Sequence, residues 1–261
     1  VSGPHTLTLS GNDIDLAAVD VDALVQPAGT GTTTFHDAVT VAGAGGIDVT
    51  THAVLIAGAL TSTGGGDIDI EATLGSAPTR TIEVGADITA NGGGVTLIAL
   101  DGLSVTPGTN PTIQGQTGTI TGNVVGNGGD VLLDFASDLI LSGGNVSGVQ
   151  NLTRTGGGDT FVSGEIITTG FQHYLSGDVI LQANTTFAGT DLSFAGTVSG
   201  PHALTIGKTG TATASAIFDD AVTVSALVVT PQVVDLALLG NTTVTGAGAT
   251  TFRNTGVLTL G

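Results

Sequence analysis

The sequence predicts an all-β solenoid, a parallel β-helix in which each coil of the chain stacks on the coil before it. Gly accounts for 43 of the 261 residues, about twice its average usage. Val and Thr, whose β-branched side chains fit a pleated sheet, are abundant, and aromatic residues make up only 3%. No helical periodicity of useful length is present, so the composition favours strands throughout.

A short Gly-rich segment recurs between apolar runs and divides the chain into units of similar size. Three copies contain Gly-Gly-Gly, and the copies end at residues 46, 66, 94, 129, 158 and 177. A supersecondary unit that repeats at this period is typical of a solenoid. At roughly 20–25 residues per coil, the chain predicts about 11–13 coils in one domain that spans residues 1–261.

The predicted strands are short runs in which apolar residues alternate with Thr or Asp. The clearest runs are residues 6–9, 68–70, 95–97, 222–224 and 257–260. Alternation places one set of side chains in a core and the other set in solvent. Runs this short, separated by Gly, suit the bends of a coil better than the longer strands of a sandwich.

A long-range repeat joins the two ends of the chain. Residues 1–9 match residues 198–206, and residues 35–41 match residues 218–224, with a gap that is 14 residues longer in the first copy. We expect the extra residues to lie within residues 11–29 and to bulge out as a loop while the strands keep their register.

Phenylalanine marks a second repeated unit, in which a Phe precedes small residues and a later apolar residue. Six of the eight Phe residues open such a unit: 35, 161, 187, 194, 218 and 252. We expect these rings to stack inside the core in adjacent coils. The alternative, a binding role, requires them to be exposed.

The net charge of −18, with only four Lys and Arg residues, limits the classes of partner. It argues against nucleic acids and anionic lipid surfaces, which both require basic residues. No apolar stretch approaches the length of a membrane span, so no membrane insertion is expected. The chain begins and ends in the middle of its pattern, which indicates a segment of a longer protein.

Calcium is the one ion that the sequence suggests, and only as a weakly bound one. Pairs of Asp residues separated by one position share a face of an extended segment, and the candidate ligands are Asp13, Asp15, Asp20, Asp22, Asp67 and Asp69. The strict calcium-binding repeat of β-roll proteins is missing. The alternative is a solvated acidic surface, and no other cofactor is expected.

Catalytic motifs are not evident. The tightest carboxylate pair, Asp219 and Asp220, aligns with His36 and Asp37 of the first repeat, which indicates a turn. The five His residues lack metal-binding spacing, and the Gly-Gly-Gly segments lack the Lys of a phosphate-binding loop. We therefore expect the protein not to be an enzyme.

Residues 169–224 carry a recognisable style of repeat. They contain Gly170-Phe171-Gln172-His173-Tyr174, then Phe194-Ala195-Gly196-Thr197-Val198, and close on Phe218 and its neighbours. This stretch resembles the repeats of filamentous haemagglutinin and other two-partner-secreted bacterial exoproteins. The resemblance implies a right-handed parallel β-helix, export across the outer membrane, and adhesive or scaffolding work at the outer cell surface or outside the cell.

These observations predict a non-enzymatic extracellular rod, a segment of a large bacterial surface or secreted repeat protein that mediates adhesion or display. A self-assembling filament, sheath or surface-layer subunit is the alternative, and a carbohydrate-active β-helix enzyme is a minor one. The expected partners are other copies of the protein or adjoining coils of its own chain, end to end. A cell-surface or glycan ligand is a further expected partner.

Overall fold

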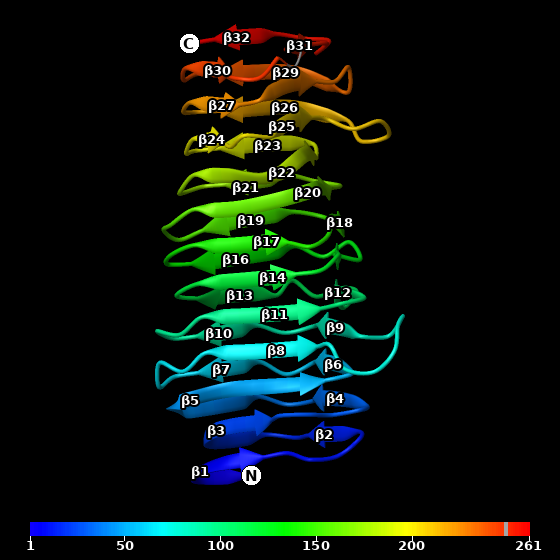
Figure 1. The fold of residues 1–261 in the computed structure, drawn as a ribbon, viewed down its shortest axis with the longest axis vertical. Helices are drawn as coiled ribbons and strands as arrows, with labels where there is room; N and C mark the ends of the chain where they lie inside the picture. Colours follow the sequence, from blue (N-terminus) through cyan, green and yellow to red (C-terminus); the bar gives the residue numbers. More distant parts are fainter. Residues whose placement is uncertain (248–249) are drawn as a thin grey trace.

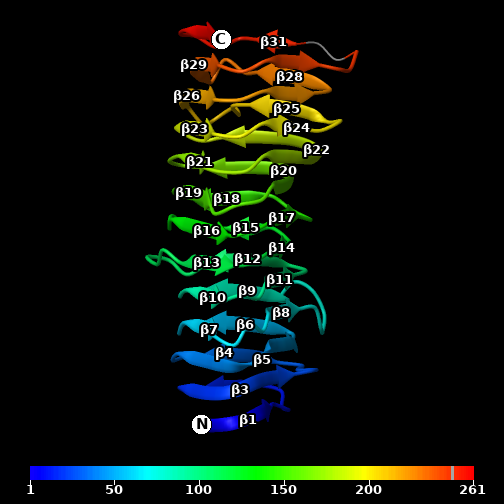
Figure 2. The same ribbon diagram turned by 90° about the vertical axis from the view of Figure 1, so that its left-hand side faces the viewer.

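The computed structural model describes residues 1–247 and 250–261 and shows an all-β solenoid of about 12 turns. The coils stack along one axis, with the N-terminus at one end and the C-terminus at the other (Figures 1 and 2). With strands stacked about 4.8 Å apart, this number of turns forms a rod roughly 58 Å long. The predicted fold class and number of coils are confirmed.

Every coil has three sides, and the strands on each side pair in parallel to form three faces that run along the rod. Face 1 consists of β1 (Ser2–Thr8), β3 (Val19–Gln26), β5 (Val39–Thr51), β7 (Leu60–Ser62), β10 (Ile88–Ala90), β13 (Thr112–Gly115), β16 (Val131–Phe135), β19 (Leu152–Thr155), β21 (Gln172–Tyr174), β23 (Asp191–Phe194), β26 (Thr213–Phe218), β29 (Val233–Leu238) and β32 (Leu258–Leu260). Face 2 includes the second halves of β1, β3 and β5, followed by β8 (Ile68–Ala72), β11 (Val95–Ala99), β14 (Gly118–Thr121), β17 (Leu139–Ser142), β20 (Thr160–Thr168), β22 (Val179–Ala188), β24 (Val198–Ser199), β27 (Val222–Val224) and β30 (Thr242–Val244). Face 3 consists of β2 (Ile14–Leu16), β4 (Thr32–Phe35), β6 (Ala53–Ile56), β9 (Thr81–Val84), β12 (Gly102–Val105), β15 (Val124–Val125), β18 (Val146–Val149), the second halves of β20 and β22, β25 (Ala203–Ile206), β28 (Ala226–Val229) and β31 (Thr251–Phe252).

The coil is right-handed. In Figure 1 the face 2 strands β8, β11 and β14 lie nearest the viewer and run to the right as the chain climbs from the N-terminus. Paired residues of neighbouring coils are separated by as few as 17 positions (Leu7 and Leu24) and as many as 28 (Leu60 and Ile88). The strands keep their register across this range because the extra residues leave the coil as loops.

The core is formed by every second residue of most strands, and the strands of the end coils are the exceptions. In β8, Ile68, Ile70 and Ala72 are fully buried, while Asp69 and Glu71 between them face outward. Burying each Val, Leu or Ile side chain contributes about 1.5–3 kcal/mol, and every coil adds several. One connected cluster of buried apolar side chains extends through the stack.

The aromatic core lies in the upper half of the rod. Tyr174, Phe194 and Phe218 stack in successive coils of face 1, with ring centroids 5.0 and 4.7 Å apart. Phe187 packs edge-on against Phe194 at 5.0 Å. The expected ring stack is thus confirmed for these three Phe residues, with Tyr174 as a member that the sequence pattern did not identify.

The same expectation is wrong for Phe161, which faces outward because Thr160 and Val162 on either side of it point into the core. Phe252 continues the inward column of Ile206 and Val229, but it is 37% exposed because it lies in the last coil. Phe35 is fully buried, but it lies in β4 near the other end of the rod.

The Gly-rich segments form the bend between face 1 and face 2. Gly46 shows why Gly is required there: its φ is +64°, and an added Cβ would lie 2.1 Å from the carbonyl oxygen of Asp67 in the next coil. Gly129 is an exception, since it precedes β16 at the bend between face 3 and face 1.

The two copies of the long-range repeat match in sequence but occupy different faces, because the second copy begins one face further around the coil. Residues 2–8 pass from face 1 to face 2, whereas residues 198–206 pass from face 2 to face 3. The expectation of a loop within residues 11–29 is wrong, because most of these residues form β2 and β3. The first copy is longer because it contains additional strands of the stack.

Candidate functional site

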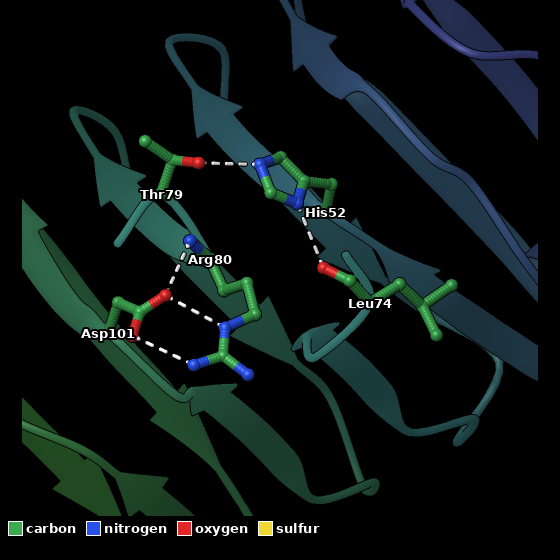
Figure 3. Close-up of polar contacts among 5 residues, drawn as sticks. All are labelled: His52, Leu74, Thr79, Arg80 and Asp101. Carbon is green, nitrogen blue, oxygen red and sulfur yellow. Dashed lines mark hydrogen bonds and ion pairs between the residues drawn. The ribbon is translucent and has the colours of Figure 1, made fainter. Parts of the chain in front are cut away.

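The most prominent projection that the structure describes is the loop of residues 73–80, which connects β8 to β9 in the longest coil (Figure 1). His52, in the coil below, contacts this loop at both ends (Figure 3). Its Nδ1 lies 2.8 Å from the carbonyl oxygen of Leu74, and its Nε2 lies 2.6 Å from Oγ1 of Thr79. Because a carbonyl only accepts, Nδ1 carries a proton and donates it to Leu74, and Nε2 pairs with the Thr79 hydroxyl.

The end of the loop is fastened to the coil above by an ion pair. Arg80 donates from Nε to Oδ2 of Asp101 at 2.8 Å and from Nη2 to Oδ1 at 2.9 Å, and its backbone N–H also donates to Oδ2 (Figure 3). These hydrogen bonds from Arg80 lower the pKa of Asp101 and raise the pKa of Arg80. The loop is thus tied to one coil by His52 and to another by Asp101. We call His52, Leu74, Thr79, Arg80 and Asp101 the loop clamp.

The loop clamp contains a hydroxyl and an imidazole at the separation of a nucleophile and its base. Each of its polar groups, however, also closes the loop onto the rod, and the ring is oriented by a backbone carbonyl. Arg80, the cation that would stabilise a developing negative charge, donates both of its side-chain hydrogen bonds to Asp101. These contacts fasten the loop to the coils on either side of it.

The sequence did not identify the loop clamp. One sequence feature could have indicated the loop: Gly75 and Pro78 lie within a coil of 28 residues. Gly and Pro are common in loops, and the extra residues of a long solenoid coil form loops.

Two of the calcium candidates, Asp13 at the bend before face 3 and Asp15 within β2, take separate partners. Asp13 Oδ1 accepts a hydrogen bond of 2.9 Å from the backbone N–H of Thr32. Asp15 is exposed, and its Oδ2 lies 3.3 Å from Nε2 of His36. Both partners belong to the next coil, so these carboxylates connect coils.

The other four candidates lie on or beside outward-facing strand positions. Asp20 and Asp22 share the outward side of β3, as expected. Asp67 Oδ1 accepts from the backbone N–H of Gly94 at 2.7 Å. Within the part of the chain that the structure describes, no group of three or more His, Asp or Glu residues is arranged to hold a metal ion, and calcium binding stays a prediction.

Asp69 has the most unusual electrostatic surroundings of the six candidates. It pairs with Asp48 in the coil below and with Thr96 in the coil above. Burial raises the pKa of Asp69, a hydrogen bond with Thr96 lowers it, and the neighbouring charges of Asp67 and Asp48 raise it again. The net effect is a raised pKa.

Asp and Asn side chains at the bends form a feature that the sequence analysis missed. Each accepts a hydrogen bond of 2.8–3.2 Å from a backbone N–H one coil further along. Three series run along the bends: Asp138, Asp159 and Asp178; Asn110, Asp130 and Asn151; Asn123 and Asn145. The recurrence of Asp and Asn at about one coil's spacing was the available signal.

Arg154 was also missed as a structural residue. It points into the core from β19 and is 1% exposed. Its guanidinium donates to the carbonyl oxygens of Phe135, Ser137 and Gly157 at 3.2, 3.0 and 2.7 Å. Burial lowers the pKa of Arg154, and the charges of nearby carboxylates partly offset this effect.

The carboxylate pair considered for catalysis lies at a bend, as the sequence predicted. Asp219 and Asp220 are both exposed between β26 and β27, and Asp220 Oδ1 accepts from the backbone N–H of Ala221 at 2.7 Å. The pair thus occupies the solvated turn expected for it.

No helical stretch with the length and apolar character needed to cross a membrane occurs in residues 1–247 and 250–261. Comparisons of the chain with protein-family models, with curated proteins and with solved structures give no significant match.

Proposed function

We propose that the protein is a non-enzymatic extracellular rod, a segment of a large bacterial surface or secreted repeat protein that works in adhesion or display. The observation that carries this proposal is the unbroken stack of about 12 turns, in which three parallel faces enclose one apolar core. Such a stack is stiff, because every coil is hydrogen-bonded to its neighbours along the axis. A stiff rod that projects a fastened loop is suited to holding a contact surface away from its support.

Most of the basic residues already have ion-pair or hydrogen-bond partners within the protein, and this supports a role without catalysis. Three of the four are engaged: Arg80 is paired with Asp101, Lys208 is paired with Glu165, and Arg154 is buried against backbone carbonyls. The fourth, Arg253, is exposed in the last coil. The cleavage of an acidic polysaccharide requires a cation placed beside the reacting carboxylate. We therefore favour adhesion over the carbohydrate-active alternative.

Adhesion is tested with beads that carry the protein, which are passed under flow over surfaces coated with epithelial cells or mucin. Beads coated with an unrelated acidic protein of similar net charge serve as the control. We expect greater retention of the beads that carry the rod. Equal retention of both kinds of bead on every surface would argue against adhesion.

A self-assembling filament is the alternative, and the exposed apolar residues of β32 favour it. Leu258 is 38% exposed and Leu260 is 67% exposed, although both continue columns of residues that are buried in the coils below. Another coil, from the same chain or a second copy, would cover them. Negative-stain images of the purified protein distinguish the two proposals, since polymers in the absence of any surface would support the filament.

A further inference from the structure

Face 2 carries an apolar stripe on its solvent side. Ile140 in β17, Phe161 in β20 and Ile180 in β22 all face outward and pair in register across three successive coils. Ile140 is 40% exposed, and the other two are half-buried. The same column carries Thr119 in the coil below and Ser199 in the coil above, so the stripe is an apolar island between hydroxyl residues.

A row of carboxylates runs beside the stripe, at the bend where face 2 begins. Asp138, Asp159 and Asp178 each lie two residues before a member of the stripe, about 6.6 Å along the strand. Each Oδ1 accepts a backbone N–H of the next coil, at 2.9, 3.2 and 2.9 Å. These bonds fix the carboxylates in a straight row and leave the second oxygen of each as an acceptor.

The charge around the row limits what can cover it. The nearest cation is the buried guanidinium of Arg154, which lies behind the bend and whose three described hydrogen bonds go to carbonyl oxygens. A second copy of this chain would bring its own net charge of −18 against the row. The surface fits a partner that carries apolar and basic side chains in two parallel lines.

The spacing of the coils indicates the secondary structure of that partner. Side chains of the stripe repeat about every 4.8 Å along the axis. Turns of an α-helix repeat every ~5.4 Å. Over the two intervals between three coils, the positions of helix turns and stripe residues therefore differ by only about 1.2 Å. Residues on one side of an extended strand repeat every ~6.7 Å. Over the same two intervals, their positions differ from those of the stripe residues by about 4 Å.

We propose that face 2 between β17 and β22 is a docking surface for a basic amphipathic α-helix that lies along the rod axis. The apolar side of the helix covers Ile140, Phe161 and Ile180, and its Lys or Arg residues lie along Asp138, Asp159 and Asp178. This is a specific binding function beyond the mechanical role of the rod, and it does not depend on where the protein works.

Two labelled peptides of the same Leu and Lys composition test the proposal by fluorescence anisotropy. Each has about 18 residues, or five turns of helix. One places Leu with the helical period and the other alternates Leu and Lys with the strand period. We expect the helical-period peptide to bind at least about tenfold more tightly. Equal affinity of the two peptides would overturn the proposal.

Variants of the protein locate the surface. Phe161→Thr places in the stripe the residue type that Thr119 already supplies in this column, and we expect it to weaken binding of the helical-period peptide about tenfold. The triple change Asp138→Asn, Asp159→Asn and Asp178→Asn keeps each Oδ1 acceptor and removes three charges. We expect it to weaken binding and to flatten its dependence on salt.

A matched triple variant separates the surface from the overall charge. Asp20→Asn, Asp22→Asn and Asp37→Asn remove the same number of charges near the other end of the rod, and we expect binding to change less than twofold. Circular dichroism confirms that all variants fold. The proposal is overturned by equal losses in the two triple variants or by unchanged binding to Phe161→Thr. It is likewise overturned if Phe161→Thr alters only self-association in sedimentation, which would assign the surface to a second copy.

Discussion

Arg154 lies directly below Tyr174 in the inward-facing column of face 1, so a buried guanidinium and a buried phenol occupy successive coils. Burial lowers the pKa of Arg154 and raises the pKa of Tyr174, so a positively charged side chain adjoins a neutral one in the core. The three carbonyl oxygens around Arg154 take the place of a carboxylate partner. In this column Arg154 separates the aliphatic side chains of Ile113 and Leu133 from the aromatic side chains that begin at Tyr174.

Arg154→Ala is expected to lower the free energy of unfolding by about 3 kcal/mol, because it leaves buried carbonyls without a donor and opens a cavity. Arg154→Met retains most of the volume, and a loss of about 1–2 kcal/mol is expected. Urea unfolding measures both, with the exposed Arg253→Ala as a control that should change stability by less than about 0.5 kcal/mol. A Met variant as stable as the native protein would show that the guanidinium contributes no net stability.

Phe194→Ala is expected to lower the free energy of unfolding by about 3–5 kcal/mol, since Phe194 lies between Tyr174 and Phe218 in the ring stack. Phe252→Ala is the matched control, because the same side chain is 37% exposed there. Its effect should be less than about 1 kcal/mol. Thermal unfolding monitored by circular dichroism compares the two variants, and similar losses in both would contradict the assignment of the core.

Arg80→Gln is expected to release residues 73–80 from the coil above without unfolding the rod. The variant loses the two side-chain bonds to Asp101, while His52 still holds Leu74 and Thr79. Hydrogen exchange of the loop amides should become faster, and exchange in β8 and β9 should not change. The double variant His52→Gln and Arg80→Gln should exchange faster still. Unchanged loop exchange in the double variant would mean that the clamp does not order the loop.

Asp69→Asn is expected to stabilise the protein at neutral pH, by less than about 1 kcal/mol because the group is partly exposed and screened by water. The pKa of Asp69 is raised in the folded protein, so the folded state binds more protons than the unfolded state between the ordinary value of 3.8 and the raised value. Stability of the native protein therefore falls as the pH rises through this window. Asn cannot titrate, so the advantage of the variant should disappear as the pH falls below the window.

Urea unfolding at a series of pH values measures this effect. Asp20→Asn, at an exposed position on face 1, is the control for the removal of one charge. A constant difference between Asp69→Asn and the native protein at all pH values would contradict the expected linkage.

Millimolar CaCl₂ is expected to promote side-by-side association of the rods more than NaCl of equal ionic strength. At a net charge of −18, neighbouring rods repel one another, and a divalent cation can bridge carboxylates of two copies. Light scattering at matched ionic strength makes the comparison. An identical response to the two salts would remove the bridging part of this prediction.

Much of the fold could be predicted because the alternation of apolar residues and the period of the Gly-rich segments are both local patterns. Residues 68–70, for example, alternate, and β8 forms there with Ile68 and Ile70 buried. The assignment of a face could not be predicted in the same way. All three bends accept similar strand–bend–strand segments, and residues 1–9 and 198–206 therefore occupy different faces despite matching sequences.

The candidate site could not be predicted from the sequence, because its contacts join residues of different coils. His52 and Thr79 are 27 positions apart, and Arg80 and Asp101 are 21 positions apart. Which residues of neighbouring coils face one another depends on loop lengths that the periodicity does not determine. Asp13 and Asp67 were named as calcium candidates, and in the structure each accepts a backbone N–H of the next coil, a role that requires knowledge of the register.

The placement of the two termini at opposite ends of the stack has a mechanical consequence (Figure 1). Tension between the ends acts along the same direction as the hydrogen bonds between coils, so terminal coils would peel away one after another. A released coil of about 20 residues can extend to roughly 70 Å, whereas it occupied only about 4.8 Å of the rod. Under load the protein would therefore lengthen in discrete steps and dissipate a sudden pull, while the coils that are still stacked continue to hold.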